Sequence, residues 1–129
     1  MNKSDVTNRT KLHIGSGWDI RPGFVNVDFI DHTGVDLVWD LNVMPWPFED
    51  NRFSEVVANH TLEHLDNVLA AIAEIWRVSR NGATIHVRCP YNVSWLAVKD
   101  LTHKHRFCWD AFANWDADIE KTGYYILDQ

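Results

Sequence analysis

The chain has 129 residues, of which 46% are hydrophobic and 23% are charged, and its formal net charge is −6. This length predicts a single domain, and the apolar fraction is typical of a chain that folds around its own core. The acidic balance argues against binding to nucleic acids or to anionic membrane surfaces, because both require a basic face.

The sequence also indicates a cellular location. Cys89 and Cys108 are too few for a disulfide framework and suit a reducing compartment. The first eleven residues are polar, unlike a signal peptide, and no apolar run approaches the ~20 residues of a membrane span. We therefore expect a cytoplasmic protein with a flexible N-terminal tail over residues 1–10 and a single domain over residues 11–129.

Short apolar runs, several of them alternating with polar residues, predict the β-strands. The first five lie at residues 11–15, 24–28, 35–40, 54–59 and 83–88, and a last strand is expected at residues 124–127.

The clearest helix is predicted between the fourth and fifth strands. Asp66 is a candidate cap at its start, and Asn81 followed by Gly82 is a typical helix end. Its apolar stripe is expected to consist of Leu65, Val68, Leu69, Ile72, Ala73 and Trp76. A strand, a helix and a strand joined by short connections form a βαβ unit, which implies an α/β fold with a mostly parallel sheet. A second, short helix is expected at residues 110–115.

Small or polar residues end four successive strands. Gly15, Asp28 and Asp40 end the first three, and Asn59 with His60 ends the fourth. The carboxyl ends of the strands in an open parallel sheet form the ligand crevice, so we expect these residues to meet at one edge.

The chemistry of these strand ends suits a nucleoside-like ligand. The run Gly-Ser-Gly at residues 15–17 lets a ligand approach the backbone, although the third glycine of the dinucleotide fingerprint is absent. Asp28 could accept hydrogen bonds from both hydroxyls of a ribose, or be a solvated carboxylate at a strand end. Asp40 and Leu41 could hold an adenine, or Asp40 could only form a turn before Asn42.

Several ordered segments resemble one family, the class I S-adenosylmethionine-dependent methyltransferases of the small, compact type. The matching segments are LHIGSG at residues 12–17, GFVNVD at 23–28, DL at 40–41, PWPF at 45–48, FSEVV at 53–57, NHTLEHL at 59–65, WRV at 76–78 and DLTH at 100–103. The resemblance implies a Rossmann-like, mostly parallel sheet with flanking helices, in a minimal methyltransferase fold. It also implies S-adenosylmethionine as the cofactor and S-adenosylhomocysteine as the product.

The resemblance further implies a role for each strand end. Gly15, Ser16 and Gly17 would face the methionine part of the cofactor, Asp28 would bind the ribose, and Asp40 with Leu41 would bind the adenine. Asn59 and His60 would flank the reactive sulfonium. The DLTH segment resembles an element of sugar-associated members, so the expected acceptor is a small molecule or a saccharide.

Methyl transfer is an in-line displacement at carbon, so such an enzyme aligns the reactants and excludes water. An oxygen acceptor also needs a base, for which histidine is suited. His103 and His64 are the candidate catalytic residues, and either could instead be an ordinary surface or packed histidine. Trp18, Trp46 and Trp95 are candidate aromatic walls around the sulfonium, or else core residues.

The chain departs from the family pattern in two ways that matter. The helix that usually separates the first two strands is cut down or missing, and the C-terminus is short. A short C-terminus could leave a sheet edge bare, and a bare edge favours pairing with a second copy, so we expect a homodimer.

Two other functions remain open from the sequence. A catalytically silent methyltransferase-like subunit would bind the cofactor, or nothing, within a larger assembly. The segment HTLEH at residues 60–64 is also a literal H-x-x-E-H, which on a helix would bind zinc in a hydrolase. A second cluster, His103 with His105 and Cys108, matches no standard zinc spacing, so no metal is expected.

Overall fold

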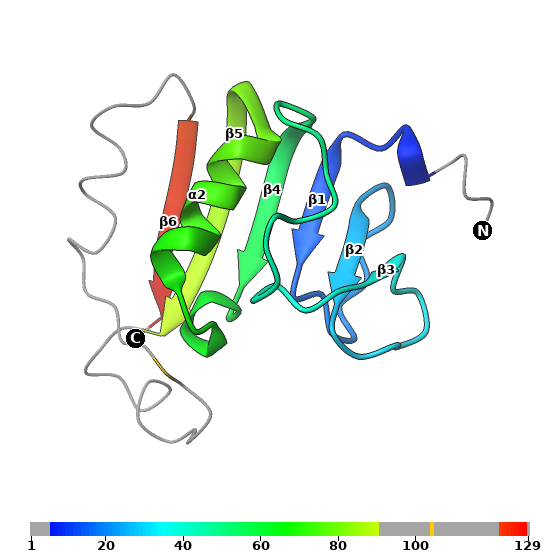
Figure 1. Ribbon diagram of the computed structural model, residues 1–129, viewed down its shortest axis with the longest axis horizontal. Coiled ribbons are helices and arrows are strands. Elements are labelled where there is room, and N and C mark those ends of the chain that lie inside the picture. Colours follow the sequence, from blue (N-terminus) through cyan, green and yellow to red (C-terminus); the bar gives the residue numbers. More distant parts are fainter. Residues whose placement is uncertain (1–5, 91–103, 105–121, 129) are drawn as a thin grey trace.

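A computed structural model describes residues 6–90, residue 104 and residues 122–128 (Figure 1). Its strands form one six-stranded sheet with the order β3-β2-β1-β4-β5-β6. The strands are β1 (Lys11–Ile14), β2 (Val25–Asp28), β3 (Leu37–Val38), β4 (Phe53–Asn59), β5 (Ser79–Pro90) and β6 (Thr122–Asp128). Every adjacent pair is parallel. This order is that of the Rossmann-like α/β fold, so the predicted fold class is confirmed.

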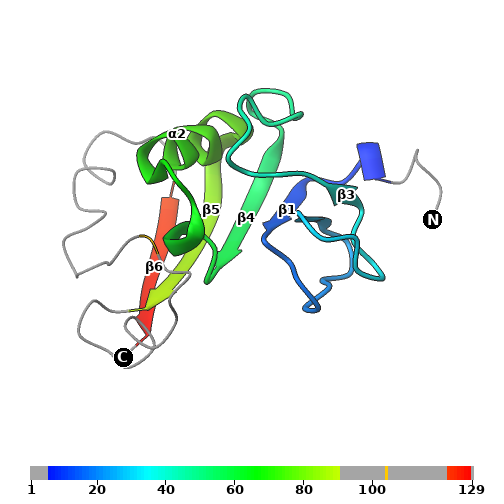
Figure 2. The ribbon, with the colours of Figure 1, turned by 60° about the horizontal axis from the view of Figure 1, so that its bottom comes forward.

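All six predicted strands are present, with shifted ends. The third is reduced to two residues, whereas the fifth begins directly after the helix and is twelve residues long. The last strand pairs with β5 along seven residues, so β6 forms one edge of the sheet and β3 forms the other (Figure 2).

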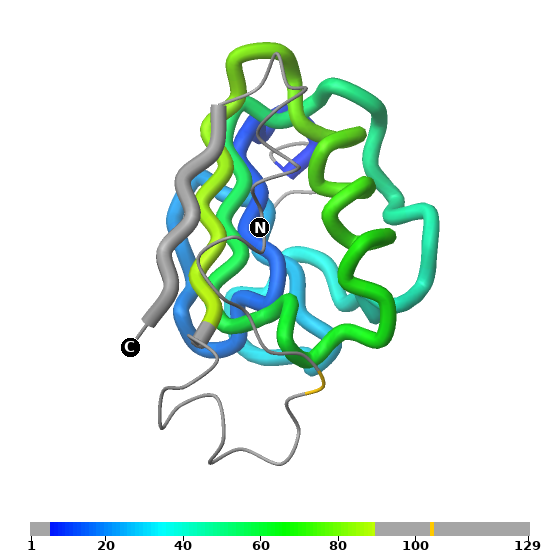
Figure 3. The backbone as a smooth tube through the Cα atoms, turned by 90° about the vertical axis from the view of Figure 1, so that its left-hand side faces the viewer, coloured from blue at the N-terminus to red at the C-terminus, as the bar shows by residue number. Residues whose placement is uncertain are grey.

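One face of the sheet is apolar and holds the core. The strand register aligns its side chains in rows, and each is at most 2% exposed: Leu12, Ile14, Val25, Val27, Val56, Ala58, Ile85 and Val87. The helix α2 (Val68–Val78) lies on this side of the strands (Figure 3). It contributes Ala71, Ile75 and Val78 to the same buried cluster. Burial of apolar surface at ~25 cal/mol per Å² is therefore the main force that fixes α2 on the sheet.

The opposite face of the same strands is polar. It carries the intervening residues, which include His13, Asn26, Glu55, His86 and Arg88. No helix in the part of the chain that the structure describes covers this face. The connection between β1 and β2 contains turns and no helix, as the sequence predicts.

The helix begins and ends at other residues than predicted. Its cap is Asn67, whose side chain accepts a hydrogen bond from the backbone N–H of Ala70 at 3.1 Å. The backbone N–H of Asp66 instead donates to the Asn42 side chain, which places Asp66 one residue before the cap. At the other end Ser79 Oγ donates to the Ile75 carbonyl at 2.6 Å, and the chain passes straight into β5.

The predicted apolar stripe of this helix is only partly correct, because Leu65, Val68 and Ile72 pack with the core whereas its other three members are exposed. Leu69 is 79% exposed and Trp76 is 46% exposed, and Ala73 is also exposed. The side chains that face the sheet are those of residues 71, 75 and 78, with residues 68 and 72 half-buried. The prediction included the large apolar side chains of Leu69 and Trp76, whereas the helix packs on the sheet through smaller side chains.

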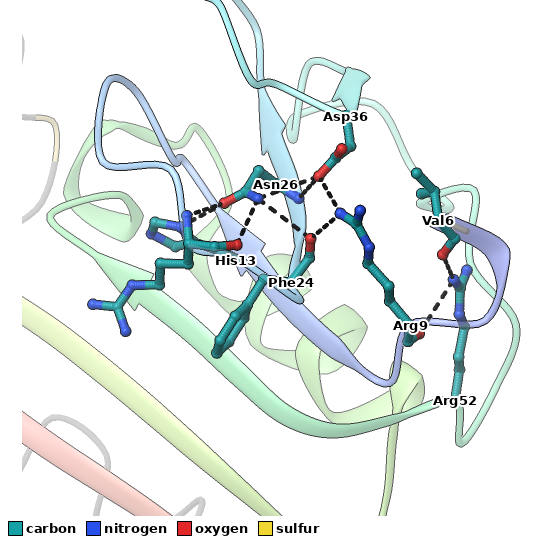
Figure 4. Close-up of polar contacts among 8 residues, drawn as sticks. Val6, Arg9, His13, Phe24, Asn26, Asp36 and Arg52 are labelled. Carbon is teal, nitrogen blue, oxygen red and sulfur yellow. Dashed lines mark hydrogen bonds and ion pairs between the residues drawn. The ribbon is translucent and has the colours of Figure 1, made fainter. Parts of the chain in front are cut away.

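A polar network joins the N-terminal segment to β1 and β2 (Figure 4). Arg9 Nη1 donates to the Phe24 carbonyl at 2.7 Å and to Asp36 Oδ2 at 3.1 Å. The same Asp36 oxygen accepts the backbone and side-chain N–H groups of Asn26 at 2.8 and 3.2 Å. His13 Nδ1 lies 3.2 Å from Asn26 Oδ1, and burial lowers the pKa of this imidazole below 6.5.

The N-terminal segment is therefore anchored at least from Val6 onward. Arg52 Nη2 donates to the Val6 carbonyl at 2.9 Å, next to the Arg9 contacts in Figure 4. Among the described residues, no helix is long and apolar enough to cross a membrane.

Candidate active site

A cavity of about 690 Å³ lies at the carboxyl ends of the strands. Its walls include Gly15 after β1, Asp28 at the end of β2, Asp40 and Leu41 after β3, and His60 after β4. Four strand ends that are far apart in sequence thus meet at one edge, as the sequence predicts. The volume is within the range of cavities that bind cofactors and drug-sized ligands.

Asp28 is held with its carboxylate toward this cavity. Its side chain is nearly buried, and it accepts the backbone N–H groups of Gly17 at 3.3 Å and Ile30 at 3.1 Å. His32 Nε2 lies 3.6 Å from Oδ2. A carboxylate offers about four acceptor positions, so two remain for hydroxyl groups of a ligand. The short loop after β1 therefore orients the Asp28 carboxylate.

Gly15 allows a close approach between the first loop and the segment that follows β4. Its φ angle is +65°, and a Cβ atom added there would lie 2.1 Å from Thr61 Oγ1. Thr61 is buried, and its hydroxyl lies 3.3 Å from the Ile14 carbonyl and 3.1 Å from the Asn59 carbonyl. Only glycine fits between these two segments at the floor of the cavity.

Ser16 and Gly17 support the loop from outside the cavity. The backbone N–H of Ser16 donates to the Val27 carbonyl at 2.9 Å, and its side chain is buried. Gly17 contributes the amide that holds Asp28. Neither residue lines the cavity, so their predicted contact with a methionine group remains a prediction.

Asp40 and Leu41 form the far wall, beside two aromatic residues. Asp40 Oδ1 accepts the Asn42 backbone N–H at 3.0 Å, which is the turn that the sequence offered as the alternative. Asp40 nevertheless lines the cavity, together with the buried Leu41. Phe29 and Trp39 complete this wall.

Two of the three tryptophans predicted as aromatic walls lie elsewhere. Trp46 is fully buried in the core, where its Nε1 donates to the Leu41 carbonyl at 3.0 Å. Trp18 is 77% exposed and stacks on His32 with a ring separation of 4.1 Å. Trp95 lies outside the described residues.

Two histidines flank a buried glutamate at the near wall. Glu63 is 1% exposed, and its Oε1 lies 3.8 Å from His60 Nδ1 and 3.8 Å from His64 Nε2. Both histidines line the cavity. His60 has a φ of +51°, an uncommon conformation for a residue other than glycine and one that is found near functional sites.

This geometry does not match the zinc-binding alternative. Leu62–His64 form a single 3-10 turn, η1, and His60 precedes it in a left-handed conformation, so the two histidines do not share one face of an α-helix. Among the described residues, no group of three or more histidine, cysteine, aspartate or glutamate side chains is placed to hold a metal ion.

A third predicted site residue, Asn59, is also absent from the walls of this cavity. Asn59 lines a second, smaller cavity instead. His103 lies outside the described residues, as do His105, Cys108 and the helix expected at residues 110–115. The intervening Lys104 does line the main cavity, and its backbone N–H donates to the Glu63 carbonyl at 2.6 Å.

Sequence reasoning missed Phe29, Trp39, Thr61 and Lys104. Phe29 directly follows Asp28, and Trp39 directly precedes Asp40. Their positions next to acidic residues at strand ends could have identified them as cavity residues. Thr61 could not be found in this way, because its role comes from the contact with Gly15.

The chain matches a family model described as a methyltransferase domain over residues 13–87, more than half of its length. No curated protein and no solved structure gives a significant match. The matched segment runs from β1 to β5 and holds every residue of the main cavity except Lys104. The chain belongs to the methyltransferase domain family.

Proposed function

We propose that the protein transfers a methyl group from S-adenosylmethionine to a small-molecule or saccharide-type acceptor. The observation that carries this proposal is the Asp28 carboxylate, oriented by the loop at Gly15–Gly17 and facing a cavity of about 690 Å³. An adenosine-sized ligand with an amino-acid tail fits such a volume.

The residues of the cavity fit the parts of this cofactor. Asp28 would accept hydrogen bonds from the two ribose hydroxyls, and Asp40 would accept one from the exocyclic amine of the adenine. Leu41 and Trp39 would pack on the adenine ring. Gly15 also lines the cavity, so the methionine chain would pass beside its backbone. Bound in this position, S-adenosylmethionine supplies an activated methyl group.

The chain's own residues would align the acceptor and take its proton. His60 and His64 both lie at the cavity wall, and each has the Glu63 carboxylate 3.8 Å away. We expect either ring to accept a proton from an acceptor hydroxyl, because histidine is a common general base. His64 is our preferred base among the described residues, and His103 remains the second candidate. Phe29 and Trp39 would exclude water from the reacting groups.

Calorimetric titration with S-adenosylmethionine and S-adenosylhomocysteine tests the cofactor site. We expect micromolar dissociation constants for the native chain. Asp28→Asn should weaken binding ~10- to 100-fold, because hydrogen bonds to a charged acceptor contribute ~1.5–3 kcal/mol. Asp31→Asn removes an exposed acid three residues further along the same loop and should change nothing.

Two outcomes would contradict parts of the proposal. If neither compound binds the native protein, the cavity is not a cofactor site and the methyl-transfer proposal fails. If both bind but no acceptor among sugars, sugar acids and small phenols is methylated, the catalytically silent subunit becomes the better description.

A further inference from the structure

An aromatic pair joins the loops that follow β1 and β2. The indole ring of Trp18 stacks on the imidazole ring of His32, with 4.1 Å between the ring centroids and 45° between the ring planes. Trp18 is 77% exposed, whereas the His32 side chain beneath it is 14% exposed. Because so little of the indole is buried, its removal should leave the stability of the fold nearly unchanged.

Both rings lie next to the groups that hold the Asp28 carboxylate. Gly17, whose backbone N–H donates to Asp28 Oδ1 at 3.3 Å, directly precedes Trp18. Ile30, whose backbone N–H donates to Oδ2 at 3.1 Å, is tied to His32, because the Ile30 carbonyl accepts the His32 backbone N–H at 2.9 Å. The stack therefore joins the two short loops that orient this carboxylate, with one loop on each oxygen.

The imidazole also faces the carboxylate directly. His32 Nε2 lies 3.6 Å from Asp28 Oδ2, which is beyond hydrogen-bond distance. Each carboxylate oxygen has about two acceptor positions, and the amides of Gly17 and Ile30 occupy one on each. Packing against the indole restricts rotation of the imidazole toward Oδ2. The stack thus keeps a polar neighbour close to the carboxylate while one acceptor position stays open on each oxygen.

We propose that Trp18 and His32 are positioning residues for the cofactor, which hold the Asp28 carboxylate in place for the two hydroxyls of a ribose. This role rests on the proposed function, which supplies the ribose. Neither ring is among the groups that line the main cavity, so both act through Asp28 and not by contact with the ligand. An acceptor that is already oriented binds more tightly than one that must be ordered during binding, so disruption of the stack should reduce affinity without loss of the fold.

Calorimetric titration with adenosine and with 2′,3′-dideoxyadenosine tests the contact with the ribose hydroxyls. The native chain should bind adenosine ~10-fold more tightly, because the dideoxy compound leaves the open acceptor positions of Asp28 without partners. Trp18→Ala and His32→Ala should each reduce this ratio of affinities to ~3 or less. A change that only loosened the cavity would weaken both compounds equally and leave the ratio as it is, so the ratio separates positioning from a structural role.

Further variants show whether the two rings act as one unit. Trp18→Tyr should keep the ratio within about twofold of the native value, because a tyrosine ring can also stack on the imidazole. Trp18→Ala combined with His32→Ala should lose no more than the larger single loss. Leu69→Ala is the matched control, since it removes an equally exposed apolar side chain, 79% exposed, from α2 and should leave both affinities unchanged. Urea denaturation midpoints should stay close to the native value for Trp18→Ala and Leu69→Ala.

The possible failures are distinguishable. If the native protein prefers adenosine and Trp18→Ala keeps that preference, or if Leu69→Ala reduces it equally, the positioning role is overturned and the proposed function stands. If the native protein binds both compounds equally, Asp28 does not meet the ribose and the positioning role is overturned as well. If neither these compounds nor S-adenosylhomocysteine bind, the proposed function fails, and the role of the two rings in cofactor binding fails with it.

Discussion

The contact between Gly15 and Thr61 gives the sharpest test of how the cavity floor is built. Alanine at position 15 would keep the left-handed φ of +65°, which costs ~1–2 kcal/mol for a residue with a Cβ. Its Cβ would also lie 2.1 Å from Thr61 Oγ1, so Thr61 must move. That movement breaks the hydrogen bond of the Thr61 hydroxyl, whose single proton lies between the carbonyls of Ile14 and Asn59 and contributes ~1 kcal/mol.

Gly15→Ala should therefore lower the free energy of unfolding by ~2–3 kcal/mol. Gly17→Ala is the matched control, because Gly17 has a φ of +51° but nothing within 4 Å of an added Cβ. It should lose only the ~1–2 kcal/mol of the backbone conformation. Urea denaturation measures both values, and titration with S-adenosylhomocysteine should show weaker binding for Gly15→Ala.

A double-mutant cycle with Thr61→Ala identifies the cause. Thr61→Ala already removes the hydroxyl, so Gly15→Ala should cost ~1 kcal/mol less in that background than in the native chain. Equal losses for Gly15→Ala and Gly17→Ala, or additive effects in the cycle, would refute the reasoning. The floor of the cavity would then not depend on this contact.

Three further predictions concern buried or paired charges. Burial lowers the pKa of His13 in the folded state, so the stability associated with its neutral form is present above pH 6.5 and is lost as the pH falls further; urea denaturation at pH 7.5 and 5.5 should show a smaller loss for His13→Gln than for the native chain. Hydrogen bonding from Arg77 lowers the pKa of Glu74, so this pair stabilises the fold above pH 4.5 and loses its effect as the pH falls through the folded pKa. Arg77→Lys should cost ~1–2 kcal/mol at pH 7, because a lysine cannot reproduce the paired N–H contacts at 2.9 and 2.8 Å, and an unchanged melting temperature would contradict this. Glu63→Gln should lower kcat at least tenfold, since it removes the carboxylate beside His64; an unchanged kcat would separate Glu63 from proton transfer.

The positions of the strands were accessible from the sequence for a clear physical reason. The first three predicted strands combine an apolar alternation with a glycine or an acid at the end, and both features follow from a half-buried strand that stops at a polar edge. The phase of the helix was not accessible in the same way. Leu69 and Trp76 are large and apolar, so a pattern of apolar residues includes them in the buried face. The side chains that are buried against the sheet are instead those of residues 71, 75 and 78.

The site residues also divide into those that the sequence could predict and those that it could not. Gly15, Asp28, Asp40, Leu41 and His60 occupy strand ends, and the topology brings them together without further information. The predicted place of Asn59 beside them overlooked the alternation within β4. Asn59 shares the parity of Glu55 and Val57, so it points to the face opposite the core, whereas His60 follows the last strand residue and turns into the main cavity.

That alternation also explains why this sheet has a polar face at all. Parallel strands covered by helices on both sides usually read as continuous apolar runs. Here β5 alternates Ala83, Ile85 and Val87, which are buried, with Thr84, His86 and Arg88, which are not. The alternating sequence of the central strands therefore produces the polar face. This face is consistent with the absence of a helix between β1 and β2. Thr84, His86 and Arg88 therefore lie on a face that no helix covers in the part of the chain that the structure describes.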